Sequence, residues 1–442
     1  MPAPNRNAPF HFGVATSSYQ IEGAVHQDGR GPSIWDRFCQ EPGRIIDGSD
    51  GSVACDHYHR YPEDVALMRE LGVSAYRFSV AWPRLFPEGR GKLNRAGLAF
   101  YDRLIDALLE AQITPFATLY HWDLPLALQE RGGWLRRETA LAFADYAAAV
   151  AGALGDRLRW YSTLNEPWVS AFVGHLTGEH APGTQNLAAA VSAAHHLLLG
   201  HALAKQAVKA QGDHQVGIVL NLSTVYPGTE RPEDQAAAQR VDAYHNGWFL
   251  DPLLRGSYPK IFGETPIPIQ DGDLEEIQKP LDFLGVNYYR KTVVTASESG
   301  LLRARYLPGV GEVTQMNWEV SPEGLYDLLL RLGQETGGKI PLYITENGAA
   351  YHDELVGGRV DDPGRVHFLQ VHLDAVQRAR RDGAWVGGYF AWSLMDNFEW
   401  AYGYSRRFGI VYVDYATQKR VPKSSYAWYQ RYIAEQRRLE AR

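Results

Sequence analysis

Short apolar runs alternate along the chain with segments whose apolar positions recur at helical spacing. Eight of the runs have the length of buried strands. Several of them are apolar at every position, which is typical of parallel strands that are covered on both faces. The eight predicted strands are residues 12–15, 76–80, 114–120, 160–164, 216–222, 283–286, 342–345 and 388–392.

Amphipathic stripes between these runs predict helices. Pro62 is expected to open one helix at its first turn, and Gly72 is expected to close it. Longer helices are expected around residues 98–108, 188–210 and 366–376, where apolar side chains repeat every three or four positions. Helical segments thus lie in the gaps between predicted strands and can cross back over the sheet.

Eight strands with helices between them predict an α/β fold, a single (β/α)8 TIM barrel over residues 1–442. Six strands would instead have indicated a doubly wound sheet. The active site of such a barrel is expected at the C-terminal ends of its strands. Irregular stretches rich in Gly, Pro and charge are predicted to be surface loops; they are about residues 30–60, 225–235, 295–320 and 350–364.

Composition narrows the class of partner and the compartment. The 442 residues carry a formal net charge of −7 and no basic block, which argues against nucleic acid or an anionic membrane as a partner. No uncharged apolar run reaches the roughly 18 residues of a membrane span. Only Cys39 and Cys55 are present and the first residues have no apolar core of a signal peptide, so we expect a cytoplasmic protein.

Polar and aromatic residues collect where the predicted strands end. Each of them alone has an ordinary explanation as a helix cap, a surface charge or a packing group. Together they would place carboxylates, amides, an arginine, a histidine and indoles at one end of one barrel, which suits a polyhydroxylated ligand with an apolar ring face. These residues are Gln20, Glu22, Arg77, His121, Trp122, Asp123, Asn165, Glu166, Asn287, Tyr288, Tyr289, Glu346, Asn347, Trp392, Asn397, Glu399 and Trp400.

Two of the carboxylates suggest a reaction. Glu166 and Glu346 follow the fourth and seventh predicted strands, which lie on different sides of the barrel mouth. Glycoside hydrolysis needs one acid to protonate the leaving oxygen and a second carboxylate to attack the sugar or to activate water. Acids that face each other across the mouth would meet that requirement.

Eight motifs in register give the chain a resemblance to a known family. They are FHFGVATSSYQIEG, YRFSVAWPRLFPEG, TLYHWDLPLAL, TLNEPW, LGVNYY, YITENG, WSLMDNFEW and RFGIVYVDY, and they span residues 10–415. The chain is similar to family 1 glycoside hydrolases of the β-glucosidase type. The resemblance implies a retaining β-glucosidase that acts by double displacement on terminal nonreducing β-D-glucosyl residues, with β-galactosides or β-fucosides as further substrates.

The resemblance also implies roles for individual residues. Glu346 would be the nucleophile and Glu166 the general acid/base. Arg77, Asn287 and Tyr289 would support the nucleophile. The substrate-binding residues implied by the resemblance are Gln20, His121, Asn165, Tyr289, Trp318, Trp392, Glu399 and Trp400. No cofactor and no metal is implied, and the expected partner is a small β-glycoside or oligosaccharide, such as one released during cellulose degradation; the oligomeric state is left open.

Two positions bear on the kind of substrate. The family more often has Gly before the residue that corresponds to Trp318, whereas this chain has Asn317, which bears on the local loop and the leaving group. Relatives that act on 6-phosphorylated sugars lack an acid at the position of Glu399. Because a carboxylate would repel phosphate, Glu399 favours an unphosphorylated sugar.

Other functions are considered beside this one. A metal-dependent barrel enzyme, such as a sugar isomerase or hydrolase, is suggested by Cys55-x-His57-x-His59 and by His195, His196 and His201. A noncatalytic sugar-binding relative would be expected to lack one of the two acids, and both are present. Transglycosylation remains open, because an acceptor sugar and water compete for the same intermediate.

Overall fold

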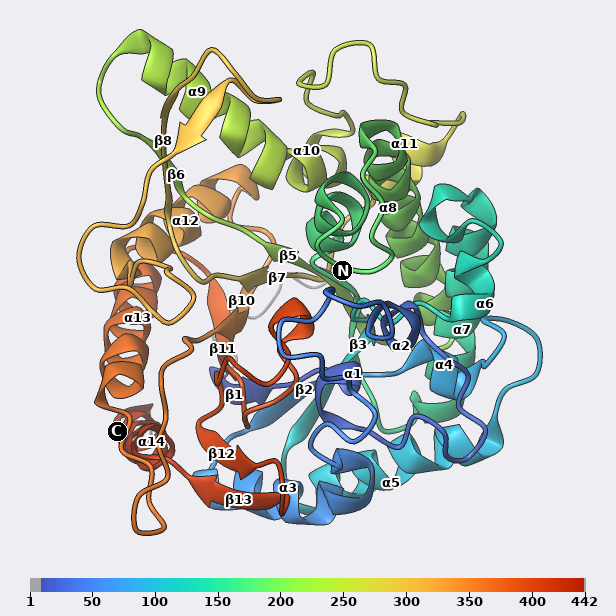
Figure 1. The fold of residues 1–442 in the computed structure, drawn as a ribbon, viewed down its shortest axis with the longest axis vertical. Helices are drawn as coiled ribbons and strands as arrows, with labels where there is room; N and C mark the ends of the chain where they lie inside the picture. Colours follow the sequence, from blue (N-terminus) through green and yellow to red (C-terminus); the bar gives the residue numbers. More distant parts are fainter. Residues whose placement is uncertain (1–8, 441–442) are drawn as a thin grey trace.

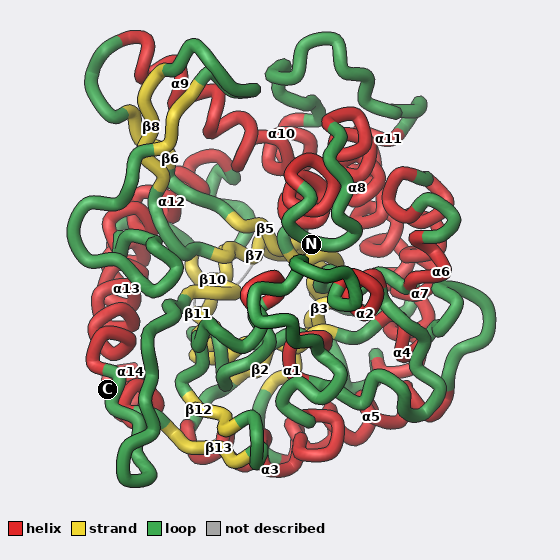
Figure 2. Tube along the Cα trace, viewed as in Figure 1, coloured by secondary structure: helices red, strands yellow, loops and turns green. Residues whose placement is uncertain are grey.

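Eight parallel strands close into a barrel, in the order β1-β11-β10-β7-β5-β4-β3-β2 around its wall. In this computed structural model, which describes residues 9–440, the barrel lies at the centre and helices surround it (Figures 1 and 2). All eight predicted strands are confirmed, and the fold is the predicted (β/α)8 barrel. The strands are β1 (His11–Ala15), β2 (Ala75–Ser79), β3 (Thr114–Tyr120), β4 (Trp160–Asn165), β5 (Gln215–Asn221), β7 (Phe283–Asn287), β10 (Leu342–Asn347) and β11 (Val386–Trp392).

The helices cover the outer wall of the barrel. The longer ones are α3 (His57–Leu71), α5 (Arg95–Glu110), α7 (Arg137–Leu154), α8 (Leu187–Lys209), α9 (Pro232–Asp242), α10 (Trp248–Arg255), α12 (Pro322–Glu335), α13 (Pro363–Arg381) and α14 (Ser424–Glu440). The remaining helices are α1 (Ser18–Ile21), α2 (Ile34–Phe38), α4 (Trp82–Leu85), α6 (Leu126–Gln129), α11 (Asp273–Ile277), η1 (Gly133–Leu135), η2 (Val169–Thr177), η3 (Ala243–Gly247) and η4 (Trp400–Tyr402).

Helix α8 is the one helix among residues 9–440 that is long and apolar enough to cross a membrane by length and composition. Its most apolar 18-residue window is 72% buried inside the protein. It packs against α7 on the outside of the barrel. Burial in the fold therefore accounts for its apolar character.

The predicted start of the third helix was wrong. Helix α3 begins at His57, and Pro62 lies inside it rather than at its first turn. The buried Asp64 carboxylate contacts His57 Nδ1 at 2.7 Å, and the Tyr58 N–H donates to the Glu22 carbonyl at 3.1 Å. These contacts fix an earlier first turn, although the proline lacks the N–H that would bond to the Tyr58 carbonyl.

Two small sheets lie outside the barrel in segments where no strand was predicted from the sequence. Strands β6 (Val225–Pro227), β8 (Thr292–Ala296) and β9 (Ala304–Tyr306) form a three-stranded sheet beside α9, and β12 (Val411–Asp414) pairs with β13 (Lys419–Pro422). The loop prediction is therefore wrong for parts of residues 225–235 and 295–320. These strands have three to five residues and are partly exposed, so they are too short for a readable alternation.

Aromatic rings fill part of the barrel interior. Phe116 stacks on Trp160 with 4.7 Å between ring centroids and meets Phe390 edge-on at 5.1 Å. Gly13 in β1 makes room for this packing, because a Cβ atom there would lie 2.5 Å from the Phe390 ring. The interior is a packed core, which leaves the C-terminal ends of the strands for a ligand.

Candidate active site

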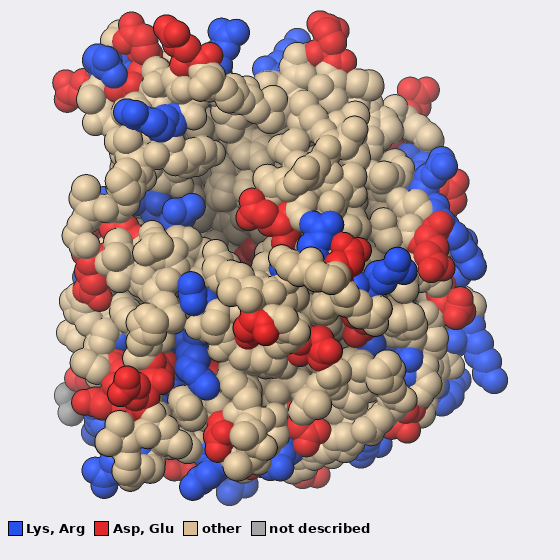
Figure 3. Space-filling view, in the orientation of Figure 1, with Lys and Arg blue, Asp and Glu red and all other residues tan. Residues whose placement is uncertain are grey.

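A cavity of about 530 Å³ lies at the C-terminal ends of the barrel strands. The space-filling view shows a deep hollow over β5, β7 and β10, with Lys or Arg atoms bordering its left side (Figure 3). Three of the predicted site residues, Gln20, Arg77 and Asn165, lie buried outside the lining. The predicted residues that line the cavity are His121, Trp122, Glu166, Asn287, Tyr289, Trp318, Glu346, Trp392, Glu399 and Trp400.

Glu346 is held at the end of β10 by two donors. Arg77 Nη1 lies 2.6 Å from Glu346 Oε1, and the Tyr289 hydroxyl donates to Oε2 at 2.5 Å. The turn beyond the strand requires Gly348, because a Cβ atom there would lie 1.7 Å from the Trp392 carbonyl oxygen. The apolar strand thus ends in a carboxylate whose two oxygens are both fixed and whose side chain is buried.

Glu166 follows directly after β4, in an unusual backbone conformation. Its φ of +46° lies in the left-handed region, where residues other than glycine are uncommon. The Asn287 amide donates to Glu166 Oε1 at 2.6 Å, and the Thr345 hydroxyl donates to Asn287 Oδ1 at 2.8 Å, which orients that amide. Neighbouring strand ends therefore aim the Glu166 carboxyl group into the cavity.

The two acids differ in their charged neighbours. Burial and the nearby negative charge of Glu346 raise the pKa of Glu166 to about 8. Burial also raises the pKa of Glu346, but Arg77 and the Tyr289 hydroxyl act in the opposite direction. As the pH rises, Glu346 therefore loses its proton before Glu166 does. At neutral pH the arrangement favours an ionised Glu346 facing a protonated Glu166.

His121 lies between two indoles at the base of the cavity. Its ring stacks with Trp392 and with Trp400, in each case with 5.9 Å between centroids. Asn165 Oδ1 accepts from Arg77 Nη2 at 2.6 Å, which fixes the orientation of the amide. The amide nitrogen, Asn165 Nδ2, therefore faces His121 and donates to its Nε2 at 3.1 Å. Burial, and then the charge of Arg77, lowers the pKa of His121 well below its ordinary value, so the ring is neutral.

The tautomer of His121 leaves one ring N–H without a partner. Since Nε2 accepts, the proton is on Nδ1, which is buried and has no hydrogen-bond partner among the described residues. A buried donor without a partner is costly unless a ligand satisfies it. His121 Nδ1 is therefore an unsatisfied donor on a residue that lines the cavity.

Glu399 and Gln20 form a second polar group at the site. We call the part of the cavity with His121, Trp392, Glu399 and Trp400 the glycone end. Burial and the charge of Glu346 raise the pKa of Glu399 to about 8. Gln20 Nε2 donates to the Phe398 carbonyl at 2.9 Å and to Asn397 Oδ1 at 3.0 Å, and lies 3.4 Å from Glu399 Oε2. Gln20 thus fixes the loop that carries Glu399 and is itself fully buried.

Trp318 flanks the outer part of the cavity. It packs on Tyr289 with 5.3 Å between ring centroids. Asn317, which stands where the family more often has Gly, has a φ of +57°. Because Asn tolerates this left-handed region better than most residues, the loop keeps a glycine-like turn.

Several residues of the outer cavity were missed by the sequence prediction. They are Trp168, Asn221, Tyr244, His245, Arg290 and Tyr306. Arg290 comes directly after Tyr289, so the strand-end argument could have reached it. His245 and Tyr244 come from η3, and Tyr306 from β9, which had no signal of their own in the sequence.

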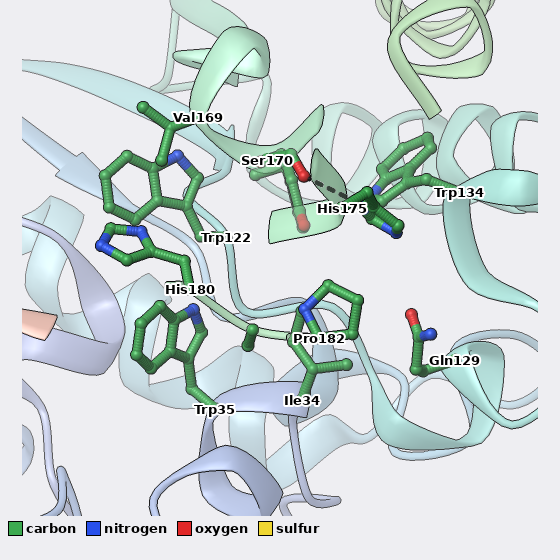
Figure 4. Close-up of a pocket in the computed structure, with 12 residues that line it drawn as sticks. Ile34, Trp35, Trp122, Gln129, Trp134, Val169, Ser170, His175, His180 and Pro182 are labelled. Atoms are coloured by element: carbon green, nitrogen blue, oxygen red, sulfur yellow. Dashed lines mark hydrogen bonds between the residues drawn. The ribbon is translucent and has the colours of Figure 1, made fainter. Parts of the chain in front are cut away.

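A much smaller cavity lies beside the first. Figure 4 shows Trp122, Val169 and His180, which line both cavities, and Ser170, whose carbonyl accepts from His175 Nδ1 at 2.9 Å. The volume of this smaller cavity is about 10 Å³. That is close to the least that one water needs and far too small for a sugar. Of these two adjoining cavities, only the larger can hold a sugar.

The histidines that suggested a metal site are separated in the structure. His57 pairs with Asp64, and His195 Nε2 lies 3.0 Å from Asp273 Oδ2. His201 Nδ1 lies 2.7 Å from the Thr163 hydroxyl. Among residues 9–440 there is no group of three or more His, Cys, Asp or Glu side chains that could hold a metal ion. The geometry of these histidines is that of packing and hydrogen bonding within the fold.

Comparisons with known proteins agree with this site. A sequence model of glycosyl hydrolase family 1 matches residues 5–438. Beta-glucosidase A of Acetivibrio thermocellus is 46% identical over 435 residues, which cover 96% of this chain and 97% of that protein. The bifunctional beta-D-glucosidase/beta-D-fucosidase of Bifidobacterium breve is 47% identical over 455 residues, with coverage of 96% and 97%.

A solved structure agrees as well. The family 1 β-glucosidase of Thermotoga maritima in complex with isofagomine lactam superimposes with a TM-score of 0.93 at 46% identity, and the match covers 96% of this chain and 97% of that one. Family, fold and site geometry thus point the same way. The chain belongs to glycosyl hydrolase family 1.

Proposed function

We propose that this protein is a retaining β-glucosidase that removes terminal nonreducing β-D-glucosyl residues. The observation that carries the proposal is the unequal pair of acids: Glu346 is fixed by Arg77 and Tyr289, whereas burial and the charge of Glu346 raise the pKa of Glu166 to about 8. One acid is thereby suited to attack and the other to give a proton. The presence of both acids disfavours a noncatalytic sugar-binding role.

In the first step, ionised Glu346 attacks the anomeric carbon and Glu166 protonates the departing oxygen. The bond to the aglycone breaks as the bond to a Glu346 oxygen forms, which gives a covalent glycosyl-enzyme. Arg77 and Tyr289 hold the two oxygens of Glu346, so the carboxylate reaches the sugar in one orientation. Such positioning removes much of the entropic barrier to attack.

In the second step, water replaces the sugar on Glu346. Once Glu346 is esterified its negative charge is gone, and one of the two causes that raise the pKa of Glu166 disappears. Glu166 then ionises more readily and takes a proton from the attacking water. Two inversions return the product to the β configuration.

The glycone end supports a neutral hexose. Glu399 lines the cavity, and because its pKa of about 8 keeps it mostly protonated at neutral pH, its carboxyl group can both donate to and accept from sugar hydroxyls. Trp392 and Trp400 offer flat apolar faces, which suit the apolar face of a sugar ring. Because the Bifidobacterium breve relative is named for both β-glucosidase and β-fucosidase activity, we propose β-fucosides as second substrates here.

Covalent trapping tests the assignment of the two acids. A 2-deoxy-2-fluoro-β-glucosyl fluoride should inactivate the enzyme, and peptide mapping by mass spectrometry should find the added sugar on Glu346. The Glu399→Gln variant, which keeps both catalytic acids, should be labelled on the same peptide. A label on Glu166, or none under full inactivation, would remove Glu346 as the nucleophile.

We also propose a cytoplasmic role on short oligosaccharides from cellulose. The support is chemical: Cys39 and Cys55 are unpaired thiols, and the cavity can hold a small glycoside. Fractionation of the source cells together with cellobiose assays of each fraction tests this. Activity only in the culture medium, or no turnover of cellobiose, would refute it.

A further inference from the structure

The outer part of the cavity contains a cation that the reaction does not use. Arg290 follows Tyr289 and lines the cavity together with Trp318, His245 and Tyr306. The Ser223 hydroxyl donates to the Arg290 carbonyl at 3.0 Å, which anchors the backbone at this point. Arg290 is exposed to solvent and forms part of the cavity wall.

The guanidinium of Arg290 makes no hydrogen bond and no ion pair with another described residue. The guanidinium makes a cation–π contact with Trp318, whose ring centroid lies 5.9 Å from the guanidinium carbon. Two acids of neighbouring segments pair with other cations: Glu319 Oε1 contacts Lys291 Nζ at 2.8 Å, and Asp242 is held by Arg331. Arg290 therefore presents an uncompensated positive charge to whatever enters the outer cavity.

The surroundings of this charge are aromatic. Trp168, Tyr244, Tyr289, Trp318 and Tyr306 all line the same cavity. An aromatic aglycone can pack on the Trp318 face, and a substituent at its far side would then meet the nearby guanidinium. Arginine binds carboxylates through two parallel N–H donors, which adds geometric selectivity to the attraction.

We propose that Arg290 and Trp318 form an aglycone site for aromatic groups that carry a carboxylate, so that the β-glucosides of phenolic acids are preferred substrates. This inference rests on the proposed β-glucosidase function. The acids lining the cavity are Glu166, Glu346 and Glu399, all at its catalytic end. An anionic aglycone would therefore meet mainly the negative charge of Glu346 if Arg290 were absent.

A pair of near-isosteric substrates tests the proposal. For wild type, kcat/KM is measured on 4-carboxyphenyl β-D-glucoside and on the neutral 4-carbamoylphenyl β-D-glucoside. The carboxylate-to-amide ratio of the two values is then compared among variants, so that differences in leaving-group chemistry cancel. Arg290→Gln should lower this ratio about tenfold, the size of a partly exposed charge-assisted contact. Arg290→Lys, which keeps the charge but loses the two parallel donors, should give an intermediate ratio.

Arg305→Gln is the matched control. Arg305 is exposed on β9 next to Tyr306, and adjacent side chains of a strand point to opposite faces. This variant removes one positive charge from the residue next to Tyr306, which lines the cavity, and its ratio should stay at the wild-type value. An equal loss in Arg305→Gln would show a long-range charge effect and overturn the proposal.

Two further outcomes separate this inference from the function on which it rests. If Arg290→Gln hydrolyses the amide normally and the carboxylate-to-amide ratio is unchanged, the anionic aglycone site is refuted while the β-glucosidase function stands. If Arg290→Gln loses activity equally on both substrates, Arg290 is a general donor and the proposed selectivity is likewise refuted. If wild type hydrolyses neither glucoside, the proposed function fails first.

Discussion

The coupling between the two acids gives the sharpest prediction. Glu346→Gln removes the negative charge that faces Glu166 but keeps the size of the side chain. The pKa of Glu166, about 8 in the unmodified protein, lies well above the ordinary glutamic acid value of 4.5, with burial as the larger cause and Glu346 as the second. The variant should therefore lower this pKa only part of the way.

The magnitude follows from the separation expected of a retaining pair. Two unit charges about 5.5 Å apart at an effective dielectric constant of about 20 interact by roughly 3 kcal/mol. This corresponds to about two pH units. The pKa of Glu166 in Glu346→Gln should therefore fall to about 6, and the residue should be mostly ionised at pH 7.

Carbon-13 NMR of protein labelled at the glutamate carboxyl carbon measures this pKa directly, with Glu166→Gln to assign the resonance. Glu399→Gln is the matched control. Burial and Glu346 raise the pKa of Glu399 to about 8, so this group carries little charge at neutral pH and its removal should shift Glu166 much less. An unchanged pKa in Glu346→Gln would refute the reasoning, since burial alone would then hold the proton on Glu166.

Two further variants test the roles of single side chains. Glu166→Ala should slow glucosides with poor leaving groups at least a hundredfold more than 2,4-dinitrophenyl β-glucoside, because only the former need a proton on the departing oxygen; equal slowing of both would remove Glu166 as the donor. Arg77→Met should lower kcat/KM about 100-fold or more and move the acidic limb of the pH profile to higher pH, because the pKa of Glu346 rises when its cation is lost; an acidic limb at lower pH would contradict that sign.

The barrel could be predicted because its strands are nearly continuous apolar runs. Residues 114–120 coincide with β3, and Glu346 and Asn347 extend the run of β10 by two residues. The strand-end argument also reached both acids, since Glu166 and Glu346 follow or end such runs. Burial on both faces of a strand leaves a strong signal in sequence.

The features that the sequence did not predict depend on contacts between distant segments. Helix α3 starts before Pro62 because His57 meets Asp64. The strands β6, β8 and β9 are short and form because they pair with one another, so no local sequence pattern predicts them. Arg290 enters the site because the β7–β8 connection brings it to the cavity wall, which a linear pattern cannot express.

The stereochemistry of hydrolysis tests the central claim most directly. Proton NMR during the first minutes of hydrolysis of an aryl β-D-glucoside, recorded before mutarotation, distinguishes the two anomers of the released glucose. A nucleophilic Glu346 with Glu166 as acid and then base predicts that β-glucose appears first. Initial release of α-glucose would contradict it, because a single inversion needs no covalent bond to Glu346.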